Sequence, residues 1–185
     1  MGVLVSLSVL CLVLGVSVAQ DLVPGRCPEF VPMVDFEIPP YLGKWYEIAR
    51  FTTEDQMGQT CNYAEYSDNG DGTVGVHNAG LEADGNFTEI FGYVEPSEVN
   101  GALILHLDGV PVAGDYNVLA TDYTTYTSVF SCVNLLGYHV EQAWVLAREP
   151  SISQEVLDTA YSAYTQWGIN DNNFQRTPQE NCVYL

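Results

Sequence analysis

From residue 43 onward the chain alternates between short runs of aromatic and β-branched residues and clusters of glycine, asparagine and aspartate. The runs have the length of single strands, and the clusters between them have the composition of turns. The strands that this pattern predicts cover residues 43–50, 62–67, 73–78, 86–95, 102–108, 115–121, 126–133 and 141–148. The series predicts an all-β fold, an eight-stranded antiparallel up-and-down barrel over residues 43–148, because closing the sheet removes its free edges.

The first predicted strand begins at Gly43, which permits a sharp turn or the close approach of another backbone. Strict alternation along this strand would place Trp45, Glu47 and Ala49 on one face of the sheet and Arg50 on the other. We therefore expect the indole and the carboxylate to point to the same side of the barrel wall, away from the guanidinium.

One later stretch has helical periodicity. Its apolar positions form a single stripe, consisting of Val156, Leu157, Ala160, Ala163, Tyr164 and Trp167. Ser151 and Gln154 have the spacing of a capping box, and Gly168 follows as a stop signal. The stripe predicts a helix within residues 151–168 that packs on the outer wall of the barrel, followed by a tail, residues 169–185, with a short additional strand.

The first 42 residues contain no predicted barrel strand. Residues 1–19 form an apolar run that ends in Ser-Val-Ala, which is typical of a signal peptide cleaved before Gln20. Residues 20–42 are rich in proline and predict an arm that wraps the barrel. The expected mature protein is a single domain over residues 20–185, secreted and extracellular, and not an integral membrane protein.

The charge of the chain restricts its partners. It has 5 basic and 24 acidic residues, which give a formal net charge of −19. Such a surface repels phosphate groups, so we expect no nucleic acid and no anionic membrane as a partner. The acidic residues solubilise the domain, and they also suggest the capture of a cationic amine with Glu47 as its anchor.

The expected mature chain has four cysteines, Cys27, Cys61, Cys132 and Cys182. An even number in an oxidising compartment predicts two disulfide bonds, and the residues alone leave three pairings open. No free thiol is then expected, which argues against a thiol-dependent isomerase. The sequence also contains no Ser-His-Asp order, no metal-spaced cluster and no glycine-rich phosphate loop. We therefore predict a protein that is not an enzyme and holds no metal.

Three segments resemble the signature regions of the lipocalins. The residues that carry this resemblance are Gly43, Trp45, Thr121, Asp122, Tyr123 and Arg148. Residues 24–27, Pro-Gly-Arg-Cys, resemble the branch of apolipoprotein D and the bilin-binding proteins, and residues 137–139, Gly-Tyr-His, resemble the crustacyanins, which bind carotenoids. The resemblance covers nearly all of the expected mature chain.

The resemblance implies structural roles for the signature residues, which would hold the closed end of the barrel together. An arginine laid over an indole gains a cation–π contact and can donate to chain-end carbonyls, so we expect Arg148 to lie over Trp45. The resemblance also selects one set of disulfide bonds, Cys27–Cys132 and Cys61–Cys182.

The chain is rich in aromatic residues, with twelve tyrosines, seven phenylalanines and three tryptophans. Tyrosine combines a flat apolar body with a polar tip, which suits a long conjugated ligand with polar ends. Alternation and the resemblance together give the candidate ligand-binding residues Glu47, Tyr66, Tyr93, His106, Tyr116 and Trp144. For Tyr93 and His106 the pattern predicts the strand but not the face, because either the leucines of residues 102–108 or His106 and its neighbours could point inward.

Charge also discriminates among the ligands that the resemblance implies. A buried carboxylate requires a partner, and the expected mature chain offers only Arg26, Lys44, Arg50, Arg148 and Arg176. A neutral ligand is therefore favoured, first a carotenoid chromophore such as astaxanthin, bound by a pigment or carrier protein. The alternatives are biliverdin in a bilin chromoprotein, a retinoid, sterol or fatty acid, and a cationic amine.

Two further features concern the surface. Asn86-Phe87-Thr88 is the sole glycosylation sequon and follows a predicted turn, which favours exposure of Asn86. The crustacyanin-like features imply association with a second chain, like or unlike, although the sequence does not fix the oligomeric state.

Overall fold

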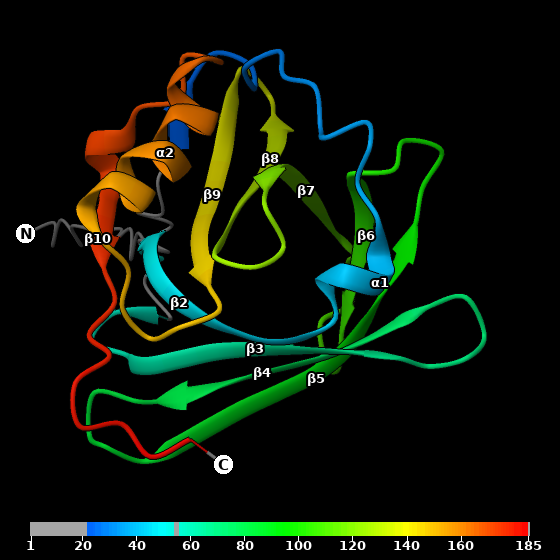
Figure 1. The fold of residues 1–185 in the computed structure, drawn as a ribbon. Coiled ribbons are helices and arrows are strands. Elements are labelled where there is room, and N and C mark those ends of the chain that lie inside the picture. The colour runs from blue at the N-terminus through cyan, green and yellow to red at the C-terminus, as the bar shows by residue number, and fades with distance from the viewer. Residues whose placement is uncertain (1–21, 54–55, 185) are drawn as a thin grey trace, which may run out of the picture.

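A computed structural model of the chain covers residues 22–53 and 56–184, so the predicted signal peptide lies outside the described residues. The barrel strands are β2 (Gly43–Phe51), β3 (Thr60–Asp68), β4 (Val74–Leu81), β5 (Phe87–Pro96), β6 (Ala102–Leu107), β7 (Gly114–Thr121), β8 (Tyr126–Leu135) and β9 (Tyr138–Ala147). Each strand pairs antiparallel with the next, and β9 pairs with β2, so the sheet closes into the predicted eight-stranded barrel (Figure 1).

Two short strands extend this sheet. β10 (Phe174–Arg176) pairs with β2, which confirms the short strand predicted for the tail. β1 (Leu22–Pro24) pairs with β9 and was not predicted, because prolines dominate its surroundings. A proline is tolerated in β1 because this strand lies at the edge of the sheet, where the missing N–H of Pro24 removes no bond between central strands.

The turn between β8 and β9 differs from the sequence-based expectation. β9 begins at Tyr138, three residues before the predicted strand, because residues 136 and 137 alone connect the two strands. Both adopt positive φ, 39° at Leu136 and 90° at Gly137, as a tight two-residue hairpin turn requires. Leu136 is not a typical turn residue, so the composition of the sequence did not predict this turn.

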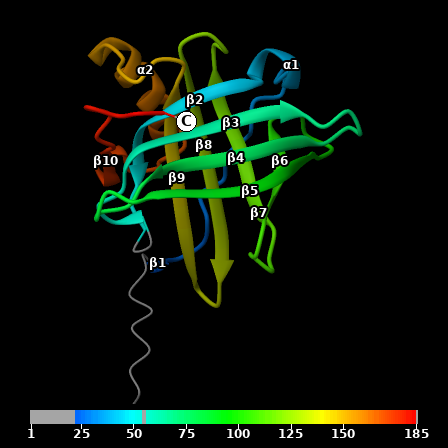
Figure 2. The same cartoon turned by 90° about the horizontal axis from the view of Figure 1, so that it is seen from below.

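The barrel wall separates two apolar cores. The inner core includes Trp45, Tyr66 and Val129, whereas the outer core lies beneath α2 (Gln154–Thr165) and includes Phe130 and Tyr164. Figure 2 shows β3, β4 and β5 lying side by side and crossing β7, β8 and β9, with α2 to one side. α2 packs on β7, β8 and β9, as the predicted apolar stripe requires.

The cap of α2 differs from the predicted capping box. Ser153, and not Ser151, is the N-cap residue, and its hydroxyl accepts from the Val156 amide at 3.3 Å. Gln154 is the first helical residue, so its side chain points along the helix and donates to Asp158. The predicted stop is present just after the helix, where Gly168 has a φ of 76°.

A bulge in β2 overturns the alternation predicted for the first strand. The register with β9 shifts between Glu47 and Ala49, so Ile48 and Ala49 both belong to the outer core. Arg50 consequently lies on the same side as Glu47 and donates a hydrogen bond to its carboxylate. The prediction that the carboxylate and the guanidinium lie on opposite faces was wrong, because one extra residue in a strand reverses the faces that follow it.

The expected contact at the closed end is present. The Arg148 guanidinium lies 3.7 Å from the centre of the Trp45 ring, and the indole is fully buried. The same guanidinium donates to backbone carbonyls of three segments, at Pro40, Lys44 and Tyr123, with distances of 2.9 to 3.0 Å. One side chain therefore joins the chain before β2, the start of β2 and the β7–β8 turn.

The backbone conformation at the start of β2 favours glycine, because Gly43 has a φ of 96°, which side chains disfavour. The neighbouring β7–β8 turn is fixed by Asp122, whose carboxylate accepts from the amides of Thr124, Thr125 and Tyr126.

Two disulfide bonds tie the ends of the chain to the barrel. Cys27–Cys132 attaches the N-terminal arm to β8, and Cys61–Cys182 attaches the C-terminal tail to β3. These are the pairs that the lipocalin resemblance implies. None of the described cysteines therefore offers a free thiol.

Candidate functional site

The barrel encloses a cavity of about 690 Å³. In an up-and-down barrel, alternate connections lie at the same end of the sheet. The β2–β3, β4–β5 and β6–β7 connections all contribute to the lining of this cavity, so they surround its mouth. The opposite end is covered by α1 (Ile38–Tyr41), a short helix whose residues line a small separate void. The volume falls in the range that suits a small-molecule ligand.

The lining is polar at the mouth and combines apolar with some polar side chains along the strands. The mouth contributes Thr53, Gln56, Gln59, Glu82, Asp108 and Val110. The apolar part of the wall includes Ile90, Leu105, Leu107, Val129, Trp144 and Leu146. Of the predicted ligand-binding residues, the structure brings four together in this lining, namely Glu47, Tyr66, Tyr116 and Trp144. A hydrophobic molecule would therefore meet aromatic and aliphatic surface below a polar rim.

Three buried tyrosines form the floor. The Tyr41 hydroxyl lies 2.7 Å from that of Tyr116, which lies 2.8 Å from that of Tyr66. Tyr66 and Tyr116 line both the cavity and the void beneath it, so this hydroxyl chain marks the boundary between them. A phenol both donates and accepts, so the chain can run in either direction and leave its last hydroxyl as a donor or as an acceptor.

These hydroxyls remain protonated at neutral pH. Burial raises the pKa of Tyr41 to about 12, and it raises the pKa of Tyr66 and of Tyr116 well above the usual value. The proximity of the three hydroxyls raises the pKa of Tyr66 and Tyr116 further, because neighbouring phenolates would repel one another. The floor therefore presents neutral oxygen to a ligand.

No lysine or arginine belongs to the described lining of the cavity. Arg50 lies close by, but its Nη1 atom is hydrogen bonded to Glu47, and only 4% of the residue is exposed. Glu47 is therefore already neutralised and also accepts from the Thr177 hydroxyl at 2.6 Å. The cavity thus has neither a free cation for a carboxylate ligand nor, at Glu47, an unpaired carboxylate for an amine.

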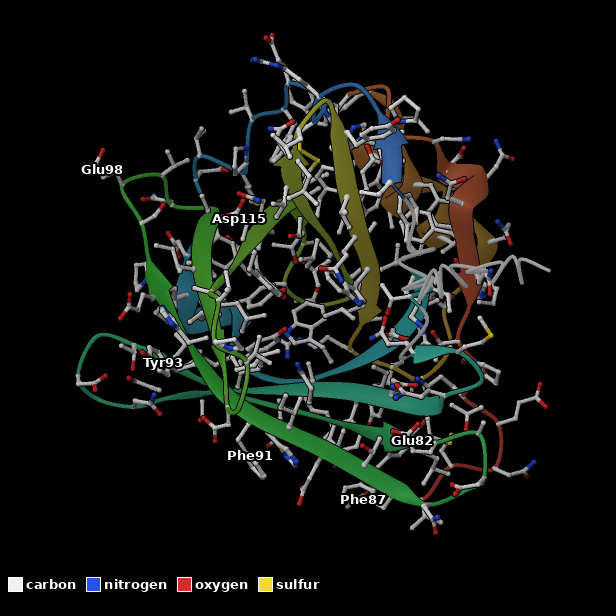
Figure 3. The ribbon with its side chains drawn as sticks, turned by 180° about the vertical axis from the view of Figure 1, so that it is seen from behind. Glu82, Phe87, Phe91, Tyr93, Glu98 and Asp115 are labelled. Carbon is white, nitrogen blue, oxygen red and sulfur yellow. A yellow bond between two sulfur atoms is a disulfide. The ribbon has the colours of Figure 1, made fainter. Side chains whose placement is uncertain are left out.

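Tyr93 and His106 lie on the outer face of the barrel, which corrects their inclusion among the residues expected in the cavity. Their rings stack on each other with centres 4.6 Å apart, and His106 lies 3.4 Å from the Glu95 carboxylate. On the same strands, Val94 and Leu105 point inward instead. Figure 3 shows Tyr93 together with Phe91 and Phe87 along the outer side of β5.

Sequence reasoning missed Tyr41, Arg50 and the role of the β2–β3 connection. Tyr41 lies in the proline-rich arm, where no periodicity indicates which way a side chain points. Arg50 was hidden by the bulge at Ile48. The one available signal was the pairing of a glutamate and an arginine three residues apart in an otherwise apolar strand, which favours an ion pair if the strand is irregular.

His139, like His106, does not line the cavity. His139 is buried on β9 and lies 3.1 Å from the Glu141 carboxylate, next to Cys132. Cys132 is already bonded to Cys27, so its sulfur is not a thiolate that could bind a metal ion.

This fold and cavity define a lipocalin. The sequence profile described as "Lipocalin-like domain" matches residues 35–179, and the chain belongs to this family. It is 32% identical to apolipoprotein D of Macaca fascicularis over 186 residues, which span 97% of this chain and 96% of the relative. The predicted resemblance to the lipocalins of the apolipoprotein D branch is thereby confirmed.

Solved structures agree with the fold. Lobster apocrustacyanin A1 superposes with a TM-score of 0.76 at 23% identity, covering 86% of this chain and 92% of its own. Insecticyanin from the tobacco hornworm Manduca sexta gives a TM-score of 0.76 at 24% identity, covering 88% and 90%. Among the described helices, none has the length and apolar character needed to cross a membrane.

Proposed function

We propose that this protein binds a neutral hydrophobic molecule in the barrel, a carotenoid such as astaxanthin, and acts as a pigment or carrier protein. The observation that carries the proposal is the cavity itself, with its apolar wall, its floor of protonated tyrosines and no lysine or arginine in its described lining. Shape and hydrophobic contact would supply the affinity, and the floor would select the polar end of the ligand.

The floor suits a ligand that ends in a keto or hydroxyl oxygen. Tyr66, the end of the hydroxyl chain that lines the cavity, can donate to a keto oxygen or accept from a hydroxyl. A ring such as that of astaxanthin carries both groups. A carotenoid hydrocarbon of similar size carries neither and would leave the hydroxyls without this additional bond.

Charge weighs against the anionic alternatives. Biliverdin and fatty acids carry carboxylates, and burying a carboxylate without a partner is costly. Biliverdin would have to leave its propionates at the mouth, whose described lining includes Glu82 and Asp108. A retinoid or a sterol avoids this cost and remains the next alternative to a carotenoid.

Capture of a cationic amine is supported by the acidic mouth but not by Glu47, which is paired with Arg50. An amine would therefore bind near Glu82 and Asp108 rather than deep in the barrel. Replacing Glu47 with glutamine tests the amine proposal as first made, because an unchanged amine affinity would contradict it.

The first experiment is an absorption spectrum of the protein purified from its native source. We expect a visible band whose chromophore extracts into organic solvent as a carotenoid. A bilin in the extract would overturn the charge argument. A colourless protein would exclude the pigment role and direct ligand assays to retinoids and sterols.

The second experiment titrates delipidated protein with astaxanthin and with β-carotene, using quenching of tryptophan fluorescence. We expect the wild type to prefer astaxanthin and Tyr66→Phe to lose about fivefold of that preference, since each lost hydrogen bond is worth about 1 kcal/mol. Tyr161→Phe, outside the barrel on α2, is the matched control. An equal preference in both variants would contradict the proposed role of the floor.

The proposal includes secretion, with residues 1–19 removed as a signal peptide and a mature domain over residues 20–185. Two disulfide bonds that join distant parts of the chain support an oxidising compartment. Sequencing of the mature N-terminus should begin at Gln20. Asn86 is exposed in the β4–β5 turn and is the proposed glycosylation site, which a mass shift on glycosidase treatment would test.

Association with a second chain, like or unlike, is also part of the proposal. The outer face of β5 supports it, because 40% of Phe87, 49% of Phe91 and 37% of Tyr93 are exposed there. Sedimentation velocity of the natively purified protein should then give a mass above that of one chain, and Phe91→Ser should reduce it.

A further inference from the structure

Arg50 connects the interior of the barrel to its mouth. Its Nη2 atom donates to two backbone carbonyls, Gln56 O at 2.6 Å and Gln59 O at 3.3 Å. Its Nη1 atom donates to Glu47 and to the Asn62 side-chain oxygen at 3.2 Å. A single planar guanidinium thus binds residues 56–59, here called the mouth segment, to β2 and β3.

The mouth segment also contacts the β4–β5 connection. The Gln59 side chain donates to Glu82 in the β4–β5 connection, at 3.1 Å. A Cβ at Gly58 would lie 2.9 Å from the Cβ of Ala83, so the segment approaches that connection closely. Since Gln56, Gln59 and Glu82 all line the cavity, a displacement of this segment would change the width of the mouth.

The charge of Arg50 is balanced from the opposite side. Glu47 accepts from Arg50 and from Thr177 of the tail, and the Gln179 side chain donates to the carbonyls of Glu47 and Asn62 at 2.8 and 2.7 Å. This arrangement gives the buried guanidinium a counterion and fixes its orientation. The carboxylate is therefore a support for Arg50 and not a binding group for the ligand.

We infer that Arg50 is a positioning residue that fixes the mouth segment and thereby slows the passage of ligand into and out of the barrel. The inference rests on the proposed function, because it concerns the same cavity. Arg50 makes no contact with the ligand in this proposal. It acts through the carbonyls of Gln56 and Gln59, and its loss would alter both rates of exchange more than the affinity.

Arg50→Lys is the informative variant. A lysine keeps the charge next to Glu47, so no buried carboxylate loses its counterion, but its compact ammonium group cannot reach Glu47, Asn62 and both carbonyls together. Arg176→Lys, the same change at an exposed position of β10, is the matched control. Should Arg50→Lys fail to fold, the uncharged double variant E47Q/R50Q tests the same contacts without a lone charge.

Two measurements decide the inference. Hydrogen exchange should become about tenfold faster at the amides of residues 56–59 in Arg50→Lys while the amides of β8 keep their protection, because a charge-assisted hydrogen bond to the segment is lost. Stopped-flow quenching with all-trans-retinol, a neutral polyene alcohol, should show association and dissociation rates that both rise about tenfold, with less change in their ratio.

Faster exchange at β8 as well as at residues 56–59 would show general destabilisation and overturn the inference. Wild-type exchange at the segment, or unchanged retinol rates in a variant whose segment is loosened, would overturn it too. If the wild type binds neither retinol nor astaxanthin, the proposed function fails, and hydrogen exchange alone still decides whether Arg50 holds the segment.

Discussion

Two arginines hold the two ends of the barrel in different chemical settings. At the closed end Arg148 lies on the face of Trp45 and donates to backbone carbonyls, so its described partners are neutral. At the mouth Arg50 shares its donors between two carbonyls, an amide oxygen and the Glu47 carboxylate. The first contact is sustained by the aromatic core, whereas the second depends on a charge balance to which the tail contributes. We therefore expect changes at the closed end to alter global stability and changes at the mouth to alter ligand exchange.

The largest effect on stability is expected from Trp45→Ala. The indole is fully buried in the inner core and also supports Arg148, so its removal should lower the free energy of unfolding by about 3–5 kcal/mol. Urea unfolding followed by far-ultraviolet circular dichroism measures this change. Trp167→Ala, at a partly buried residue just after α2, is the control and should cost less. Equal losses would show that the closed end is not the more important support.

Removal of each disulfide bond in turn also distinguishes the closed end of the barrel from its mouth. Removing Cys61–Cys182 by a double replacement with serine should lower the free energy of unfolding by about 2–4 kcal/mol, and the same replacement at Cys27–Cys132 should cost a similar amount. Only the first change frees Thr177 and Gln179 from Glu47. Retinol dissociation should therefore accelerate in the Cys61–Cys182 variant alone. A matching acceleration in both variants would remove the link between the tail and the mouth.

A smaller loss, about 1–3 kcal/mol, is expected from Arg148→Lys, because an ammonium group cannot serve carbonyls of three segments and stack on an indole at once. Its urea midpoint should fall while the exchange of residues 56–59 stays at the wild-type value. Arg50→Lys should show the reverse order of effects. Identical behaviour of the two variants would contradict the distinction between a structural end and a regulating end.

The closed end could be predicted from the sequence because its residues occupy recognisable positions at the ends of strands. Gly43 at a strand start and Arg148 after the last strand occupy positions that an up-and-down barrel defines, and the signature resemblance added the contact with Trp45. The inner face of β6 and the tyrosine floor could be predicted only in part. Tyr66 and Tyr116 follow strand alternation, but Tyr41 comes from an arm without periodicity.

The mouth could not be predicted for a related reason. Alternation is a reliable guide only while the register is regular, and the bulge at Ile48 moves Arg50 to the inner side without leaving a mark in composition. The contacts of Arg50 are then made to backbone carbonyls, which every residue possesses. No residue type in the β2–β3 connection could therefore indicate them.

The last prediction concerns pH and the floor. Burial raises the pKa of Tyr41 to about 12 and raises the pKa of Tyr66 and of Tyr116 well above the usual value. The folded protein therefore holds these protons more tightly than the unfolded chain, in which tyrosine ionises near pH 10. The resulting stabilisation is complete below about pH 10 and is lost as the pH rises through the folded-state values. Urea unfolding at increasing alkaline pH should therefore show a steady fall in the free energy of unfolding, accompanied by late ionisation of these phenols in the absorption spectrum. The double variant Y66F/Y116F should lose less stability over the same range, whereas Tyr138→Phe, which removes an exposed hydroxyl, should behave as the wild type. If every tyrosine of the folded wild type ionised together near pH 10, the floor would be open to hydroxide, and the neutral oxygen that it is proposed to offer a ligand would lose its physical basis.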